Sequence, residues 1–361
     1  MNSNKELTAI KRVNNGYFHR VNRETPTQFW INGARNIDLG LGLQAGAVGV
    51  TANPSHPPRA IKADSEIWYP VIDEILRLHP ALSDDEVADF VTQRIQGMSA
   101  KMLHPLYKIS NGKYGYVAIQ GNPNTNDDLE DIVERGIVYS KLGENIVVKC
   151  VSTAVGIKAL EELTAKGINT IATEGFSVTQ AIKAAEAYER GLKRTNKKPK
   201  CFIVHIAGIF DEYLTEVAER EDRNINISSK YIEQAGVLVT RSIYRIFQER
   251  KFHCMLLGGG ARAPRHFTEL VGGDLAITIS LNTVEDLLLK DPPVVSKIEV
   301  DDTKVLSELE SKFVDFRRAY YPDGLTVDEF RSFGPCVKFQ NSCLKGYNET
   351  LGEVQARRGR L

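Results

Sequence analysis

Eight short apolar runs, separated by longer segments with helical spacing, are the feature that most constrains the fold of this chain. Most of the runs are apolar almost without interruption, as expected for strands buried on both faces of a parallel sheet. Their alternation with helices predicts a (β/α)8 TIM barrel, and an open doubly wound sheet is the alternative. The runs are FWIN from Phe29, AVGVTA from Ala47, YVAIQG from Tyr116, IVVKCV from Ile146, INTIATEG from Ile168, CFIVHIAG from Cys201, HCMLLGGG from His253 and LAITIS from Leu275.

The domain organisation follows from the length and from two segments outside the alternation. The 361 residues are enough for one barrel domain or for two smaller domains, and we expect a single domain over residues 1–361. The barrel core is predicted at about residues 27–290. Residues from about 61 to 108 predict two extra helices after the second strand. Residues from about 305 to 361 predict appended C-terminal helices, broken at Pro322-Asp323-Gly324.

Composition and charge narrow the classes of function. The chain has 46 Lys and Arg residues and 46 Asp and Glu residues, so charge provides no argument for nucleic acid or a membrane as a partner. No apolar run approaches the roughly 20 residues of a membrane span, and the N-terminal segment lacks the apolar core of a secretory signal. The five cysteines are scattered without CxxC pairing. We therefore expect a cytoplasmic protein without structural zinc.

Polar side chains at the ends of the predicted strands are the candidates for chemistry, because active sites of barrels lie at the C-terminal ends of the strands. Among them, Lys149 interrupts the apolar run from Ile146. A buried ammonium group is costly, so burial favours a neutral amine that can attack a carbonyl group. The alternative is a lysine whose stem packs while its charged end reaches water. The full set is Asn32, Asn53, Gln120, Lys149, Thr173, Glu174, His205 and Arg262.

Several motifs in this order resemble the transaldolase family. The segment from Val147 to Ala187 is similar to the core of that family, in which a strand ends in a lysine and a Phe-Ser-x-x-Gln-Ala helix follows the next strand. GVTANPS from Gly49 resembles its Thr-Thr-Asn-Pro-Ser element, and YVAIQGNP from Tyr116 resembles its third strand. LLGGGAR from Leu256 resembles a seventh-strand segment that ends in an arginine. The matches span about Thr27 to Leu288, so the chain resembles a divergent member of this family.

The resemblance implies a class I aldolase barrel in which Lys149 forms a Schiff base with a ketose carbonyl, without a metal or a cofactor. The chain departs from the family at the ends of the first and third strands, with Asn32 in place of an aspartate and Gln120 in place of a glutamate. An uncharged carboxamide barely accepts a proton, so neither side chain can be the general base. Fructose-6-phosphate-aldolase-like relatives also carry glutamine at the third-strand position. Ile171 occupies the place of a fifth-strand asparagine, whereas Thr173 is retained.

Two residues are candidates for moving protons in place of the missing carboxylates. Glu174 follows the fifth strand, although it could instead be a charge near the start of the helix after Ser177. His205 stands at a predicted strand end and titrates near neutrality, although a packed core histidine is an equal alternative. Asp211, just beyond, could orient His205 or cap the following helix.

The sixth strand departs furthest from the family pattern. Val204 and Ile209 stand where the family places a serine and an arginine that hold the substrate phosphate. Arg262 matches the other phosphate-contacting arginine, but it could equally bind a carboxylate or pair with an acidic side chain. We therefore expect a changed substrate terminus.

The sequence thus predicts a lysine-dependent, metal-free aldolase or transaldolase-like enzyme that acts on a sugar or another polyhydroxy carbonyl compound. Asn32, Asn53, Gln120 and Thr173 would position hydroxyl groups and water, and Arg262 would hold an anionic end. The alternative is a barrel that binds a sugar or metabolite without turnover. A homo-oligomer is possible in either case, since the C-terminal helices could cover the barrel or contact a second subunit.

Overall fold

The chain folds into a closed barrel of eight parallel strands, in which each strand pairs with its neighbour in the sequence and β8 pairs with β1. A computed structural model describes residues 15–220, 225–300 and 302–361. The predicted (β/α)8 barrel is confirmed, and the open sheet is ruled out by the pairing of β1 with β8. The strands are β1 Gln28–Asn32, β2 Gly49–Thr51, β3 Tyr116–Ile119, β4 Ile146–Val151, β5 Thr170–Thr173, β6 Cys201–Ile206, β7 Met255–Gly259 and β8 Ala276–Ile279.

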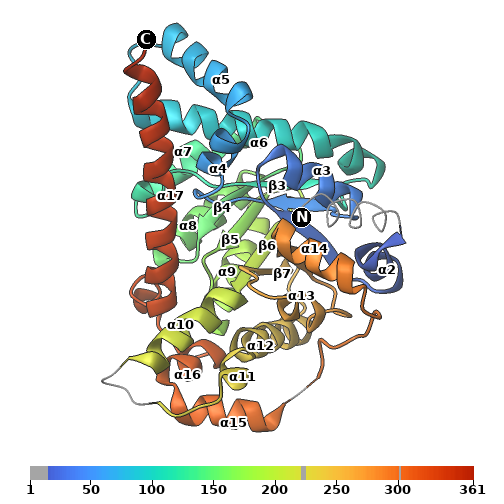
Figure 1. Ribbon diagram of the computed structural model, residues 1–361. Coiled ribbons are helices and arrows are strands. Elements are labelled where there is room, and N and C mark those ends of the chain that lie inside the picture. The colour runs from blue at the N-terminus through green and yellow to red at the C-terminus, as the bar shows by residue number, and fades with distance from the viewer. Residues whose placement is uncertain (1–14, 221–224, 301) are drawn as a thin grey trace.

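Helices surround the barrel (Figure 1), and the ends of α8 and α9 show the expected capping chemistry. The Ser177 hydroxyl accepts a hydrogen bond from the Gln180 backbone N–H at the start of α9, and Gly167 adopts a left-handed φ of 77° after α8. None of the helices within the described part of the chain is both long and apolar enough to cross a membrane. The surrounding helices are α2 Tyr17–Glu24, α3 Asn36–Gln44, α7 Leu129–Ser140, α8 Ala154–Ala165, α9 Val178–Leu192, α10 Ala207–Glu219, α11 Ser229–Ile232, α12 Ala235–Arg250, α13 Arg265–Thr268 and α14 Leu281–Lys290.

The insertion between β2 and β3 contains three helices, where the sequence predicted two. They are α4 Pro57–Ala63, α5 Ser65–Leu78 and α6 Asp84–Ile109. The additional helix is α4, which begins at two prolines whose fixed φ suits the first turn of a helix. The three helices share a small apolar cluster with Tyr347 and Val354 from the C-terminal helix.

The C-terminal segment forms the predicted appended helices, with the break at Pro322-Asp323-Gly324 as expected. These are α15 Thr303–Lys312, α16 Val314–Tyr320, the short η3 Val327–Glu329 and the long α17 Gly334–Arg358. In Figure 1, α17 (red) runs along one side of the barrel from α10 to α5. It packs closely, since a Cβ added at Gly346 would lie 2.4 Å from Ser55 Cα in the loop after β2.

Three aromatic side chains fill the barrel interior. The ring of Trp30 lies 4.8 Å from that of Phe202 and 6.5 Å from that of Tyr116, which in turn lies 5.4 Å from Phe202. Gly49 provides the space for Trp30, because a Cβ there would lie 2.3 Å from the indole ring. Below the strand ends the barrel is therefore a packed core, and open space remains at the C-terminal ends of the strands.

Candidate active site

A cavity of about 870 Å³ lies at the C-terminal ends of the strands. Its wall includes side chains from β1, β2, β4, β5, β6, β7 and β8 and from α17, so it is the site that barrel topology assigns to chemistry. Five of the eight candidate residues line this cavity directly. They are Asn32, Asn53, Lys149, Thr173 and Arg262.

Lys149 is the half-buried residue of an otherwise buried β4, and its side chain reaches the cavity. Its Nζ donates a hydrogen bond to the Ala52 carbonyl oxygen at 2.9 Å. Burial lowers the pKa of Lys149 to about 8, and the charges of Cys343 and Glu174 partly oppose that change. Since a fraction of the amine is then neutral near pH 7, this lysine is suited to attack a carbonyl group.

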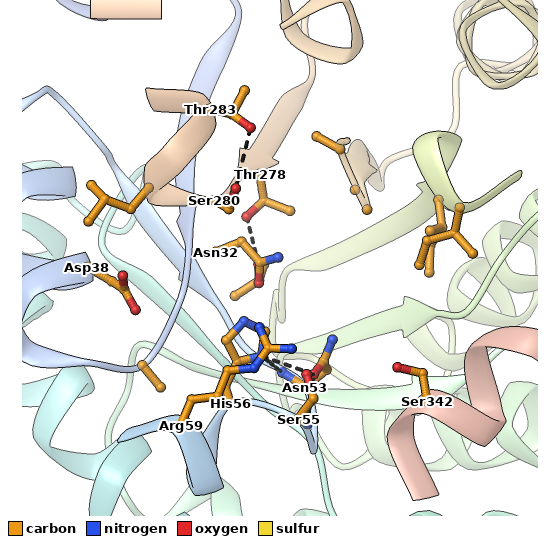
Figure 2. Close-up of a pocket in the computed structure, with 18 of the residues that line it drawn as sticks. Asn32, Asp38, Asn53, Ser55, His56, Arg59, Thr278, Ser280, Thr283 and Ser342 are labelled. Atoms are coloured by element: carbon orange, nitrogen blue, oxygen red, sulfur yellow. Dashed lines mark hydrogen bonds between the residues drawn. The ribbon is translucent and has the colours of Figure 1, made fainter. Parts of the chain in front are cut away.

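A polar wall is built on β1, β2 and β8. The Thr51 hydroxyl donates to Asn32 Oδ1 at 3.3 Å and lies 2.6 Å from the Thr278 hydroxyl. Asn32, Thr278 and Ser280 follow one another along this wall in Figure 2. The wall therefore presents hydroxyl and amide groups, which suit the hydroxyl groups of a polyhydroxy compound.

The loop after β2 continues the polar wall around Asn53. Asn53 Oδ1 accepts hydrogen bonds from the Ser55 backbone N–H at 2.9 Å and from the Ser55 hydroxyl at 2.7 Å. His56 packs beside it and accepts a hydrogen bond from the Asn53 backbone N–H. Burial first, and then the charges of Arg59 and Lys149, lower the pKa of His56 to about 4, so the ring is neutral near pH 7. His56 was not among the residues predicted from the sequence, although it stands only three residues after Asn53.

Gln120 and Glu174 form a buried pair, and Glu174 interacts electrostatically with Lys149. Gln120 Nε2 donates to Glu174 Oε1 at 3.0 Å, and Gln120 and Lys149 share the wall of a smaller space of about 20 Å³. Burial raises the pKa of Glu174, while the hydrogen bond from Gln120, the charge of Lys149 and the Cys343 thiol lower it. Glu174 thus interacts with the candidate nucleophile, and its side chain is not merely a charge at the start of α9.

Carboxylates are scarce in the main cavity. Among the described residues that line it, Asp38 is the only acidic one, and Arg35 holds it through hydrogen bonds of 3.0 Å from Nε and 2.6 Å from Nη2. Gln120 and Glu174 are not among the residues that line this cavity, although Glu174 interacts electrostatically with Lys149. If Glu174 exchanges a proton, the group closest at hand is therefore the Lys149 amine, because Glu174 does not line the cavity.

His205 does not lie in the cavity, which corrects the expectation that it moves protons there. Val204 and Ile206 of β6 point into the cavity, so the alternation of side chains along a strand turns His205 outward. There its Nδ1 lies 2.8 Å from the Thr240 hydroxyl of α12. Burial lowers the pKa of His205 to about 3, as expected of a packed core histidine.

Asp211 does not orient His205 either. Its carboxylate lies 2.8 Å from His266 Nε2 and accepts the Gly236 backbone N–H at 2.8 Å. The second contact caps the start of α12, whereas the sequence suggested a cap on the helix that directly follows β6.

Arg262 lines the cavity but is already paired with an acidic side chain. Its Nε donates to Glu212 Oε1 at 2.7 Å, and the arginine side chain is 45% exposed. Of the three roles left open by the sequence, the structure shows the ion pair. An anionic substrate group would have to compete with Glu212 for this guanidinium.

The C-terminal helix α17 supplies residues to the site that were not predicted from the sequence. Phe339 and Ser342 line the cavity, and the thiols of Cys336 and Cys343 face the Glu174 backbone oxygen and carboxylate at 3.7 and 3.8 Å. Three of these residues, Cys336, Phe339 and Cys343, are spaced by three and four positions, which places them on one face of a helix.

Comparison with curated proteins shows similarity to transaldolases at low identity. A Nostoc sp. protein named Transaldolase 2 is 31% identical over 188 residues, which cover 51% of this chain and 46% of that protein. A transaldolase of Gibberella intermedia is 26% identical over 231 residues, covering 60% of this chain and 65% of that protein. A probable transaldolase of Dictyostelium discoideum is 24% identical over 330 residues, covering 86% and 95%.

The family comparison extends over most of the barrel. Residues 36–321 match the transaldolase/fructose-6-phosphate aldolase family, from the start of α3 to just beyond α16. The match thus includes the strand that carries Lys149 and every later strand, and it ends before α17. The chain belongs to the transaldolase/fructose-6-phosphate aldolase family.

Proposed function

We propose that this chain is a transaldolase-like enzyme whose Lys149 forms a Schiff base with a ketose or a related polyhydroxy carbonyl compound. The observation that carries the proposal is the amine of Lys149, which projects into a cavity at the strand ends with a pKa lowered to about 8. The named relatives are transaldolases, which supports an enzyme that makes or breaks carbon–carbon bonds.

In the proposed reaction, Lys149 forms a covalent bond with the substrate and is freed again by water at the end. The neutral amine attacks the ketose carbonyl carbon, and loss of the carbonyl oxygen as water leaves an iminium ion. The bond between the third and fourth carbons then breaks, its electron pair forms an enamine, and the departing half leaves as an aldehyde once its hydroxyl proton is removed. The enamine can attack an acceptor aldehyde to form a new bond, and water releases the product from the amine.

The surrounding residues have distinct proposed roles. Asn32, Asn53 and Thr173 would hold the substrate hydroxyl groups along the polar wall. Glu174, assisted by Gln120, would exchange protons at the lysine amine, because Gln120 orients its carboxyl group and burial raises its pKa. The iminium ion itself accepts the electron pair, so the proposed reaction requires no metal. All five cysteines are free and buried, in keeping with a reducing compartment such as the cytoplasm.

Reduction with borohydride tests this proposal directly. The protein would be incubated with dihydroxyacetone, hydroxyacetone or fructose, reduced, digested and mapped by mass spectrometry. We expect a covalent adduct on Lys149 that is absent in Lys149→Met. Binding of these compounds without any adduct, or an adduct that persists in Lys149→Met, would refute the proposed role of this lysine.

A further inference from the structure

The wall of the cavity on the side of β6 and β7 is apolar, unlike the polar wall on β1, β2 and β8. In the closed barrel, β6 lies across from β2, so the two surfaces face each other. The apolar surface is made by Val204, Ile206, Ile209, Leu257, Ala261 and Phe339, which we call the apolar wall.

The apolar wall is a packed surface held in place by the glycine turn after β7. A Cβ added at Gly259 would lie 3.0 Å from Val204 Cγ1, and one added at Gly260 would lie 2.2 Å from Ile206 Cγ2. Gly260 also has a φ of 63°, which glycine adopts at no steric cost. The turn therefore lies directly on the side chains of β6, and a larger residue there would clash with them.

This wall offers little to an anion. The one charged side chain that the described residues contribute beside it is Arg262, and Glu212 holds that guanidinium at 2.7 Å. A phosphate group placed against Ile206 and Ile209 would lose hydration without gaining a charge-assisted hydrogen bond. An alkyl or aryl group placed there would instead gain free energy by leaving water.

We propose that the apolar wall binds the end of the substrate remote from the reacting carbonyl. The substrate class is then a carbonyl compound that is hydroxylated next to the reacting carbon and apolar, as a deoxy, alkyl or aryl group, at its far end. This inference rests on the proposed Schiff base at Lys149 and specifies which acceptor aldehydes the enamine attacks. In that step the enamine carbon bonds to the aldehyde carbon, the aldehyde oxygen takes up a proton, and water releases the new ketose from Lys149.

Matched acceptor series test the proposal with the full chain. Dihydroxyacetone would serve as donor, and propanal, butanal and pentanal as acceptors of nearly equal intrinsic reactivity. Each added methylene group is expected to raise kcat/KM about fourfold, as burial of one methylene group predicts. Glyceraldehyde and glyceraldehyde 3-phosphate form a second pair, in which the phosphate is expected to lower kcat/KM or leave it unchanged.

Substitutions at Ile209 and Glu212 test the location of the site. Ile209→Arg combined with Glu212→Gln provides one new guanidinium and frees Arg262, so the preference for glyceraldehyde 3-phosphate over pentanal should rise by about tenfold or more. Ile209→Ala, a milder change, should reduce the gain per methylene group. Ile109→Arg is the matched control, because Ile109 is 85% exposed at the far end of α6; it should leave the preference unchanged.

The outcomes separate this inference from the proposed function. Borohydride adducts on Lys149 together with equal kcat/KM across the alkanals, or with a preference for the phosphorylated acceptor, would overturn the inference and leave the Schiff base intact. The absence of every adduct would overturn the proposed function, and the inference with it.

Discussion

Replacement of Lys149 with methionine is expected to stabilise the fold at neutral pH, because the cavity wall is an unfavourable place for an ammonium group. Burial lowers the pKa of Lys149 from 10.5 to about 8. Each pKa unit corresponds to about 1.4 kcal/mol, so the charged amine reduces the free energy of unfolding by about 3 kcal/mol at pH 7. Methionine has a similar length and no charge, and therefore avoids this cost.

The pH dependence distinguishes the charge from other effects of the substitution. Between pH 8 and pH 10.5 the unfolded chain keeps the proton that folded Lys149 has lost, so the stability of the parent protein rises with pH in this window. The advantage of Lys149→Met should therefore shrink by about 2 kcal/mol between pH 7 and pH 9.5. Loss of the hydrogen bond to the Ala52 carbonyl offsets about 1 kcal/mol of the advantage, with little dependence on pH.

Urea unfolding of the parent protein and Lys149→Met at pH 7, 8, 9 and 9.5 measures this difference. Lys101→Met is the control, since Lys101 is exposed on α6, and it should change stability little at any of these pH values. A difference for Lys149→Met that stays constant over the series would show that folding does not lower the pKa of this lysine.

Three further substitutions examine the surroundings of the lysine. Glu174→Gln should lower turnover by about 100-fold or more if Glu174 exchanges protons, and unchanged turnover would exclude that role. The same substitution should move the acid limb of the pH profile of imine formation to lower pH, because the Glu174 charge raises the pKa of Lys149. His205→Asn should leave the shape of the pH–rate profile between pH 5 and 8 unaltered, and a lost limb would place His205 in the reaction after all. Gly346→Ala, which introduces a Cβ 2.4 Å from Ser55 Cα, should cost about 1–3 kcal/mol of stability by forcing α17 away from the loop that carries Asn53, and thermal unfolding with a KM measurement would detect both effects.

The sequence predicted the barrel because its strands are buried on both faces and therefore appear as separate apolar runs. Because the strands are buried on both faces, the sequence does not show which side chains point into the barrel. In the run from Cys201, inward and outward residues are equally apolar, so no alternation distinguished His205 from Val204. His205 was predicted to face the cavity because it lies near the end of a strand. In the structure it points away from the cavity and contacts Thr240.

Residues that reach the site from distant segments of the chain could not be predicted from local sequence patterns. Cys336 and Cys343 follow Glu174 by more than 160 residues, and both reach it only because α17 packs along the barrel. The spacing of Cys336, Phe339 and Cys343 is compatible with one face of a helix, but the spacing alone does not specify what that face contacts. The partner of Arg262 was undetermined for the same reason, because the sequence contains many acidic residues and Glu212 is selected by the position of α10.

The pairing of Gln120 with Glu174 bears directly on the proposed role of Glu174. The resemblance assigns a glutamate to the end of the third strand, and this chain has Gln120 there instead. The carboxylate follows β5, and its oxygen lies 3.0 Å from the Gln120 amide. Glu174 holds a left-handed φ of 59°, a conformation that costs a non-glycine residue about 1 kcal/mol or more. Glycine would avoid that cost, so the side chain at this position is kept in spite of it. The strained backbone and the buried carboxyl group are both consistent with the proposed role of Glu174, in which a carboxyl group after β5 serves in place of one on β3.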